Sequence, residues 1–277
     1  MVAASPARHA PEADTGNEMN MQVRKQREDV AEGERLLRQV VPVFVNSFEQ
    51  PTYLRNMLDW LHANRFGRVI VLDQASSYPP LLDYYASEAF RERAHLVRLG
   101  KNVGPRAALD ILPQWVRENG FHIFTDPDLD MPDRVAPDFL TRLIALARRY
   151  NARKVGVALD ISDPSAFHDR KVKFSRNHPA GRVEEWEGQF WDTALEPDVY
   201  AAAVDTTFHL HNPQATLSAR QALRKWRGKR HVYREIRVAG AGFVARHLPW
   251  YRDDGCPAEE KAHYLSRAAE WSNWVQA

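Results

Sequence analysis

The chain has 277 residues, of which 44% are hydrophobic and 27% charged, so it can bury a substantial core. Its net charge of +2 gives no general attraction for nucleic acid or for an acidic membrane surface, so any anion site must be local. The single cysteine, Cys256, excludes an intramolecular disulfide and a cysteine-based zinc cluster, which fits a reducing compartment. We therefore expect a globular, cytoplasmic protein without a nucleic-acid partner.

The first 38 residues differ in composition from the rest of the chain. Residues 1–21 are rich in Ala, Pro, Asn and acidic residues and lack the apolar core of a signal peptide. Residues 23–39 are highly charged, which fits a solvated helix or more of the same tail. No apolar run approaches the roughly 18 residues of a membrane span, so no transmembrane segment is expected. We expect residues 1–38 to form a disordered or helical extension and residues 39–277 a single domain.

Apolar runs and helix-like segments alternate through the first half of the chain. The expected strands are 40–47, 69–73 and 95–99, and the expected helices are 51–64, 81–88 and the segment after Pro105. The strands are rich in β-branched residues, whereas apolar residues recur at helical spacing in the helices. This alternation predicts a mostly parallel sheet with right-handed crossovers, flanked by helices.

Polar residues follow the ends of these strands, where α/β proteins bind ligands. Asn46, Asp73 and Asn102 each stand at or just after a strand end, so we expect them to face one crevice. Asp73 suits a hydrogen bond to a base or ribose, although an acid in this place can equally cap a turn. Gly104 allows close approach of the backbone to a ligand, and Arg106 at a helix start suits a phosphate.

A cluster of acids follows the next predicted strand, in the sequence FHIFTDPDLD at residues 121–130. Asp126, Asp128 and Asp130 stand at alternate positions after a buried apolar run. Carboxylates this close repel one another unless a cation lies between them, and Mg²⁺ or Mn²⁺ takes such ligands. A calcium loop is excluded because its required Gly and Glu are missing. A polar turn and an Asp-nucleophile phosphatase pattern are the alternatives.

The second half offers candidates for acid–base chemistry. Glu187 lies among large aromatics at 184–191, a composition that suits sugar binding or an amphipathic helix. Asp205 begins a β-rich segment in which His209 and His211 point to one side, as metal ligands or as half-buried polar residues. The basic residues 219–230 suit a helix or loop rim that meets phosphates or solvent. The glycine-rich GAGFVA segment after residue 239 matches a dinucleotide fingerprint, but a nearby proline prevents the helix that this motif needs.

Four features occur in a fixed order: the strand ending at Asp73, the Ser-containing turn, Asn102-x-Gly104 and the Thr-Asp-Pro-Asp string starting at Thr125. This order resembles the nucleotide-sugar half of a GT-A glycosyltransferase, similar to the broad family 2 group. The resemblance covers roughly residues 40–162. It implies that Asp126 and Asp128 hold a divalent metal that bridges the donor's diphosphate, with Asp130 as a further ligand or as an acid behind the ligands.

A histidine near the C-terminus of GT-A enzymes often completes the metal site, and His247 is placed to do so. The string from Arg246 to Trp250, RHLPW, resembles the H…KPW signature of some retaining members. His247 is therefore expected as a further metal ligand, the alternative being an imidazole that packs beside Trp250.

These features together predict a metal-dependent glycosyltransferase with a GT-A, Rossmann-like mixed sheet. Residues 39–162 would bind a nucleotide diphosphate sugar with Mn²⁺ or Mg²⁺, and residues 163–277 a hydroxyl acceptor. An inverting reaction needs a carboxylate base, for which Asp205 and Glu187 are candidates, whereas a retaining reaction needs none. The alternatives are a sugar nucleotidyltransferase, which usually has a Gly-rich basic loop where this chain has NSFEQ at 46–50, and a non-catalytic nucleotide-sugar-binding module.

Overall fold

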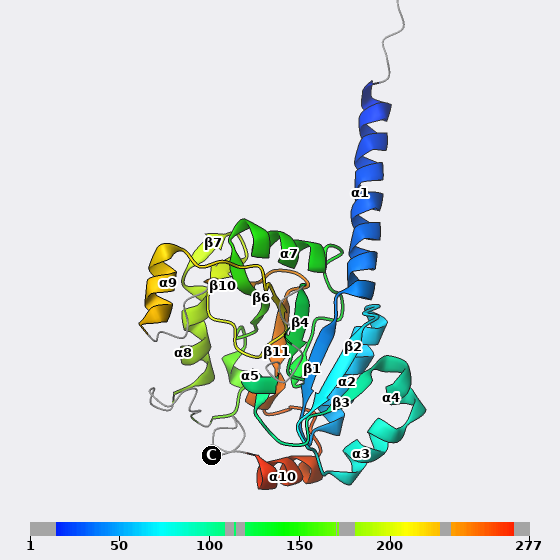
Figure 1. Cartoon of the computed structure of the whole chain (residues 1–277), viewed down its shortest axis with the longest axis vertical. Helices are drawn as coiled ribbons and strands as arrows, with labels where there is room; N and C mark the ends of the chain where they lie inside the picture. The colour runs from blue at the N-terminus through cyan, green and yellow to red at the C-terminus, as the bar shows by residue number, and fades with distance from the viewer. Residues whose placement is uncertain are drawn as a thin grey trace, which may run out of the picture.

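A mixed sheet runs through the centre of the molecule, with helices on both faces (Figure 1). The computed structural model describes residues 15–108, 114, 120–169, 171, 181–227 and 234–268. The strands are β1 (Val43–Ser47), β2 (Val69–Asp73), β3 (His95–Arg98), β4 (His122–Thr125), β5 (Leu129–Asp130), β6 (Ala152–Leu159), β7 (Ala194–Glu196), β8 (Val199–Ala201), β9 (His209–His211), β10 (Arg234–Val238) and β11 (Val244–His247). The α-helices are α1 (Thr15–Val40), α2 (Pro51–Ala63), α3 (Pro79–Ala86), α4 (Glu88–Arg93), α5 (Pro105–Ala108), α7 (Phe139–Arg149), α8 (Val183–Gly188), α9 (Ala219–Trp226) and α10 (Ala258–Arg267). The predicted α/β class, with a central sheet flanked by helices, is confirmed.

The first half of the chain forms the parallel part of the sheet. Strand β1 pairs in parallel with β2 and β4, and β2 pairs in parallel with β3. The order β3-β2-β1-β4 therefore brings the carboxyl ends of these strands to one edge of the sheet, the lower edge in Figure 1. Polar residues that follow β1, β2 and β4 meet at this edge.

The second half adds antiparallel pairs and a long-range connection. Strand β9 lies between β4 and β6 and is antiparallel to both, and β10 then pairs in parallel with β6. Strands β8 and β7 follow as an antiparallel edge. Strand β11 runs parallel to β6 and antiparallel to β5. The pairing of β11 with β5 brings the C-terminal part of the chain beside the acids that follow β4.

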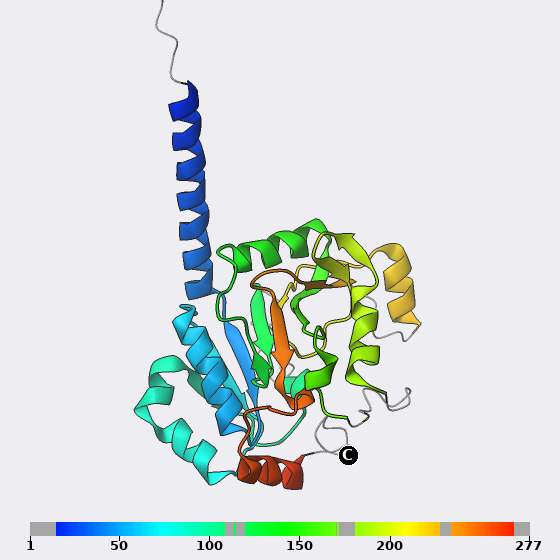
Figure 2. The same ribbon diagram turned by 180° about the vertical axis from the view of Figure 1, so that it is seen from behind.

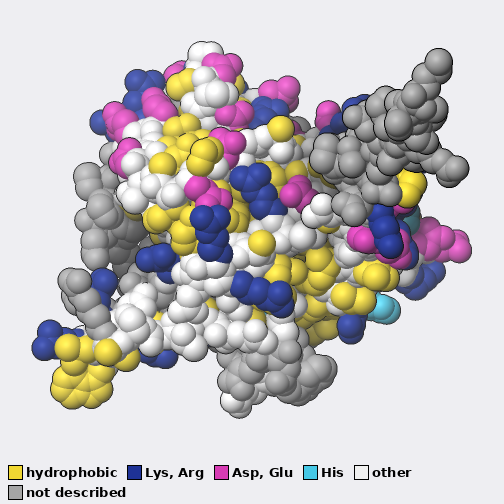
Figure 3. Space-filling view, turned by 90° about the horizontal axis from the view of Figure 1, so that it is seen from above, with side chains coloured by type: hydrophobic (Ala, Val, Ile, Leu, Met, Phe, Trp, Pro, Cys, Tyr) yellow, Lys and Arg dark blue, Asp and Glu magenta, His cyan; other side chains and the backbone are white. Residues whose placement is uncertain are grey.

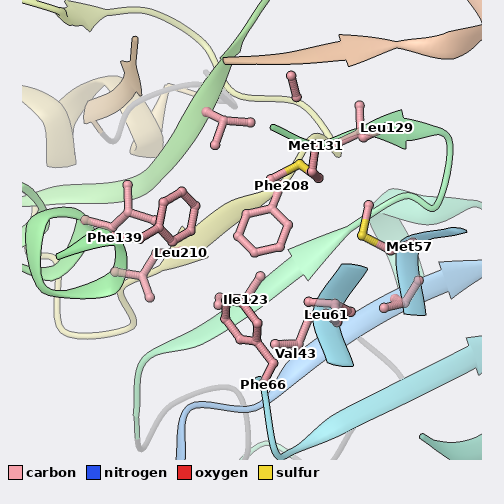
Figure 4. Close-up of a cluster of buried hydrophobic side chains, with 14 of the residues drawn as sticks. Val43, Met57, Leu61, Phe66, Ile123, Leu129, Met131, Phe139, Phe208 and Leu210 are labelled. Atoms are coloured by element: carbon pink, nitrogen blue, oxygen red, sulfur yellow. The ribbon is translucent and has the colours of Figure 1, made fainter. Parts of the chain in front are cut away.

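Alternation of side chains along the strands builds a core on each face of the sheet. Val43 and Val45 of β1 contact a large buried cluster that includes residues of α2 and α7, whereas Phe44 faces a smaller cluster on the opposite side. Figure 4 shows part of the larger cluster, with Val43, Met57, Leu61, Phe66, Ile123, Leu129, Met131, Phe139, Phe208 and Leu210 drawn together. Burying each such side chain contributes roughly 1.5–3 kcal/mol, which fixes the strand ends that carry the site.

Among the described residues, the contacts that anchor helix α1 to the body lie near its C-terminal end. Glu34 is 3% exposed, and its carboxylate accepts hydrogen bonds from the backbone N–H groups of Leu140 and Thr141 at 3.0 and 2.9 Å. Arg38 pairs with Glu34 at 2.8 Å. The rest of the helix stands out from the body in both views (Figures 1 and 2). Within the described residues, none of the helices combines the length and apolar character that a membrane crossing requires.

Candidate functional site

The acids after β4 lie where three strand ends meet. The Nδ2 group of Asn46, on β1, donates to Asp126 Oδ1 at 3.0 Å, and the backbone N–H of Asp126 donates to the carbonyl of Thr206 at 3.0 Å. Loss of water around the Asp126 carboxylate, followed by the negative charge of Asp128, raises the pKa of Asp126 above its ordinary value. Ionisation of Asp126 beside Asp128 is therefore opposed, and no salt bridge to Asp126 is formed among the described residues.

The pairing of β5 with β11 brings Asp128 to His247. Leu129 lies opposite His247 in the register, and the backbone N–H of Leu248 donates to the Asp128 carbonyl at 2.9 Å. As a result, His247 Nε2 lies 3.4 Å from Asp128 Oδ2. Burial by itself lowers the pKa of His247. The neighbouring carboxylates, of which Asp128 has the largest effect, raise the pKa above its ordinary value.

Two polar atoms at this contact lack partners. Asp128 Oδ1 and His247 Nδ1 are buried and have no hydrogen-bond partner among the described residues. An orphaned carboxylate oxygen beside a second carboxylate and an imidazole is a donor set that fits Mn²⁺ or Mg²⁺. In the described part of the chain, however, no three His, Cys, Asp or Glu side chains are gathered closely enough to hold an ion as they stand. The chemistry of Asp126, Asp128 and His247 fits a metal, and their metal role stays a prediction.

Asp130, the third acid of the cluster, has different surroundings. Its side chain is 51% exposed, and Oδ2 lies 3.4 Å from Arg246 Nη1 across the β5–β11 pair. An exposed ion pair of this kind stabilises a protein by about 0–1 kcal/mol. The structure thus gives Asp130 a basic partner of its own, and its role as a metal ligand or as an acid behind the ligands stays a prediction.

A chain of amide hydrogen bonds supports Asp126 from behind, and it centres on Gln74. Gln74 Nε2 donates to Asn46 Oδ1 at 2.6 Å, and Gln74 Oε1 accepts from the backbone N–H of Val103 at 2.9 Å. Nε2 also lies 3.3 Å from the Gly104 carbonyl. Gln74 is 1% exposed, so these bonds fix its orientation. It ties the ends of β1 and β2 to the loop after β3 and sets which way the Asn46 amide points.

Asn102, Gly104 and Arg106 lie in and after that loop. Asn102 is exposed, and its Oδ1 accepts from the backbone N–H of Gly104 at 3.0 Å, so it shapes the turn. Gly104 has φ of 79°, a left-handed conformation that favours glycine. Arg106 is the second residue of helix α5, and its side chain lies outside the described part of the structure. Contacts of these three residues with a donor stay predictions.

Asp73 is buried rather than displayed at the strand end. Its carboxylate accepts from the Tyr85 hydroxyl at 3.1 Å and from the backbone N–H of Ser76 at 3.3 Å. Tyr85 also contacts the hydroxyl of Ser47 at 2.9 Å. Turn capping, the alternative for Asp73, is the role for which the structure shows contacts, and hydrogen bonding to a nucleotide stays a prediction.

The two candidate bases have contrasting environments. Glu187 is 1% exposed and forms a buried ion pair with Arg237. The Arg237 guanidinium also donates to the Ala203 carbonyl at 2.8 Å and lies 4.1 Å from the ring centre of Phe190. Burial raises the pKa of Glu187 to about 7, although Arg237 opposes the rise. Asp205 is exposed, and its charge acts on the pKa of Asp126 and of Glu187. Asp205 thus combines proximity to the acids with access from solvent.

The histidines of β9 belong to the sheet core. His209 is 2% exposed and its Nδ1 lies 2.6 Å from the Thr207 carbonyl. His211 stacks on His122 of β4, with ring centres 4.7 Å apart. Burial lowers the pKa of His209 to about 3 and that of His211 to about 2, so both rings are neutral near pH 7. The structure gives them packing roles.

The glycine-rich segment before β11 is a tight turn. Gly240 and Gly242 have φ of 87° and 81°. A Cβ atom on Gly242 would lie 2.4 Å from the backbone nitrogen of Ala136. Close backbone packing and positive φ angles therefore explain the two glycines.

The chain was compared with known families, curated proteins and solved structures. Neither a family model nor a curated protein matches it. GalNAc-T7, solved with UDP, GalNAc and Mn²⁺, is similar over 81% of this chain and 47% of its own length, with 11% identity and a TM-score of 0.45. HddC from Yersinia pseudotuberculosis, solved with GMP-PN, is similar over 83% of this chain and 100% of its own, with 8% identity and a TM-score of 0.42. A mycobacterial protein is similar over 79% of this chain and 70% of its own, with 13% identity and a TM-score of 0.40. At such scores the likenesses carry no functional argument, which has to come from the site.

Proposed function

We propose that the protein is a metal-dependent GT-A glycosyltransferase of the family 2 type, which transfers a sugar from a nucleotide diphosphate sugar to a hydroxyl acceptor. The observation that carries the proposal is the contact between Asp128 and His247 beside Asp126. Residues far apart in the sequence meet at the carboxyl edge of the parallel strands, and the contact leaves a buried carboxylate oxygen without a partner among the described residues. Such an arrangement costs stability unless a cation or ligand completes it.

The proposed metal residues are Asp128 and His247, with Asp126 held beside them by Asn46. A bound Mn²⁺ or Mg²⁺ would supply positive charge that offsets the charge on the leaving diphosphate. The chain's own contribution is to fix the acids before the donor arrives. Because Asn46 donates to Asp126 at 3.0 Å, the carboxylate is oriented in advance, and little reorganisation is needed when the donor binds.

Asp205 is the better supported of the two candidate bases. An acceptor hydroxyl must come within hydrogen-bond reach of the base, and Asp205 is exposed near the acids. Glu187 is buried against Arg237, so an acceptor reaches it only if that ion pair opens. In an inverting reaction, Asp205 would accept the proton of the acceptor hydroxyl, and the buried ion pair of Arg237 with Glu187 would stay closed.

The segment after β1 argues against a nucleotidyltransferase. Glu49 is fully buried, and its carboxylate accepts from the backbone N–H groups of Ser77 and Tyr78 at 2.9 and 2.7 Å. His263 Nε2 lies 3.3 Å from the same carboxylate. An acidic, closed loop in this place does not offer backbone N–H groups to a triphosphate as a glycine-rich basic loop does.

The test is a screen of nucleotide sugars for donor hydrolysis and transfer, with and without Mn²⁺. The proposal expects release of a nucleoside diphosphate that depends on Mn²⁺ and on Asp128. Release of pyrophosphate from a nucleoside triphosphate and a sugar phosphate would instead identify a nucleotidyltransferase. Thermal stabilisation by a nucleotide and Mn²⁺ without turnover of any donor would identify a non-catalytic binding module.

A further inference from the structure

Helix α9 carries apolar residues on a face that the described chain leaves open. Ala219, Ala222, Leu223 and Trp226 are spaced i, i+3, i+4 and i+7, so they share one side of the helix. Trp226 is 82% exposed, more than any other large hydrophobic side chain in the described residues, and Leu223 is 46% exposed. Figure 3 shows hydrophobic side chains standing out beyond the surface, next to Lys and Arg, at the edge where α9 lies. Exposure of this kind is unfavourable in water and indicates a contact surface.

Hydrogen bonds hold the start of helix α9 in place. Asn151 Nδ2 donates to the Thr216 carbonyl at 2.9 Å, and Asn151 Oδ1 accepts from the Thr216 N–H at 3.0 Å. A capping box follows, in which Ser218 Oγ accepts from the Gln221 N–H and Gln221 Oε1 accepts from the Ser218 N–H at 2.9 Å. The start of α9 is thus tied to the end of α7, and the apolar face is presented by an anchored helix.

Except for Gln221, the remaining positions of this segment are basic. Arg220, Arg224, Lys225 and Arg227 fall within residues 219–227, which contain no Asp or Glu. A helix with an aromatic and aliphatic face and a basic remainder has the composition of segments that lie in the interface of an anionic bilayer. Tryptophan is enriched at that interface because its ring is apolar and its N–H group reaches polar headgroups.

We propose that α9 docks the protein on an anionic phospholipid surface. Trp226 and Leu223 enter the boundary between headgroups and acyl chains, while Arg224 and Arg227 meet the lipid phosphates and carboxylates. The charge complementarity is local, as a net charge of +2 for the whole chain requires. The inference does not depend on the proposed transferase activity.

Other occupants match this surface less well. A second copy packed face to face on the stripe would bring the Arg224 and Arg227 side chains of both copies near each other, and like charges repel. A nucleic acid could stack a base on Trp226, but it gains nothing from the aliphatic stripe through Leu223. Of these three occupants, the anionic bilayer is the one that satisfies both the apolar stripe and the positive charge.

The experiment is co-flotation of the full chain with lipid vesicles. Vesicles of phosphatidylcholine with about 30% phosphatidylserine are compared with vesicles of phosphatidylcholine alone, at low and at physiological salt. We expect binding to the anionic vesicles that falls as salt rises. Trp226→Ala should lower the partition coefficient at least tenfold, because the largest apolar side chain of the stripe no longer enters the interface. The double variant Arg224→Glu/Arg227→Glu should abolish binding.

Matched controls separate docking from general effects. Leu223→Ala is compared with Leu36→Ala on α1, whose side chain is 49% exposed, and only Leu223→Ala should weaken binding. Arg227→Glu is compared with Arg68→Glu, an exposed position elsewhere with the same change of charge. Equal binding to both kinds of vesicle, or full binding by Trp226→Ala, would overturn the proposal. So would loss of self-association or of RNA binding, rather than of vesicle binding, in the α9 variants. Far-UV circular dichroism and melting curves confirm that each variant is folded.

Discussion

Gln74→Glu tests the amide chain that orients Asp126. In the wild type, Gln74 Nε2 donates to Asn46 Oδ1 at 2.6 Å, which leaves Asn46 Nδ2 to donate to Asp126. An ionised carboxylate at position 74 still accepts from the Val103 N–H, but its second oxygen, which cannot donate, then faces Asn46 Oδ1. If the Asn46 amide rotates to relieve that contact, its oxygen then faces the Asp126 carboxylate. One repulsive contact between acceptors remains in either case.

The size of the effect follows from burial. Gln74 is 1% exposed and Asn46 8% exposed, so water cannot replace the lost donor. Leaving a buried polar group unsatisfied costs about 1–3 kcal/mol. With about 2–4 °C of Tm for each kcal/mol in a domain of this size, Tm should fall by roughly 2–12 °C. The loss should be larger at pH 8 than at pH 5.5, because a protonated carboxyl can donate to Asn46 Oδ1 in place of the amide.

The assay is thermal unfolding followed by circular dichroism at both pH values. Asn102→Asp is the matched control, since it makes the same amide-to-carboxylate change in the neighbouring loop. Asn102 is exposed and uses only its oxygen in the bond to Gly104, so this variant should melt close to the wild type. If Gln74→Glu also melts within about 1 °C of the wild type at pH 8, the amide chain does not hold Asp126 in the way described.

Two further predictions concern buried charge. Because the folded pKa values of His209 and His211 are about 3 and about 2, the unfolded chain takes up protons below pH 6.5 that the folded chain excludes. The free energy of unfolding should fall with decreasing pH by up to about 1.4 kcal/mol per pH unit for each histidine. In urea titrations from pH 7 to 4, His209→Asn, which keeps a donor for Thr207, should flatten this slope, and an unchanged slope would show that His209 does not titrate as argued. Arg237→Met should lower stability by about 3–5 kcal/mol, since it leaves Glu187 unpaired, whereas Arg237→Met/Glu187→Leu should recover most of the loss. Equal unfolding free energies for the wild type and Arg237→Met would contradict the role of that pair.

Much of the parallel half of the fold can be predicted from local sequence. β-Branched runs mark β1 and β2, and the predicted 69–73 agrees with β2 as the structure has it. Helix α7 was not predicted, although Phe139, Leu143 and Ala147 recur at helical spacing. The signal for this helix was therefore present in the sequence. Strand β5 has only two residues, and its existence depends on pairing with β11, which local sequence cannot show.

The candidate site shows the same division. The acids at 126–130 can be identified from the sequence, because carboxylates at alternate positions after an apolar run are conspicuous. Gln74 cannot be identified in this way, because its role comes from partners on β1 and in the loop after β3, which only the folded sheet brings together. Arg237 of β10 and Glu187 of α8 are likewise distant in sequence and meet only in the folded chain. The surroundings of Asp73 were left open by the sequence, since the residue type suits both a turn cap and a ligand contact.

The central claim is that Asp128 and His247 hold one divalent ion. Titration of Mn²⁺, followed by electron paramagnetic resonance of the free ion, measures this directly in the wild type, Asp128→Ala, His247→Ala and the double variant. The account predicts one site in the wild type that is strengthened by a nucleoside diphosphate. It also predicts that each single variant weakens binding by at least tenfold and that the double variant loses little more, because both side chains serve the same ion. Unaltered Mn²⁺ affinity in both single variants, with melting curves that show them folded, would contradict it.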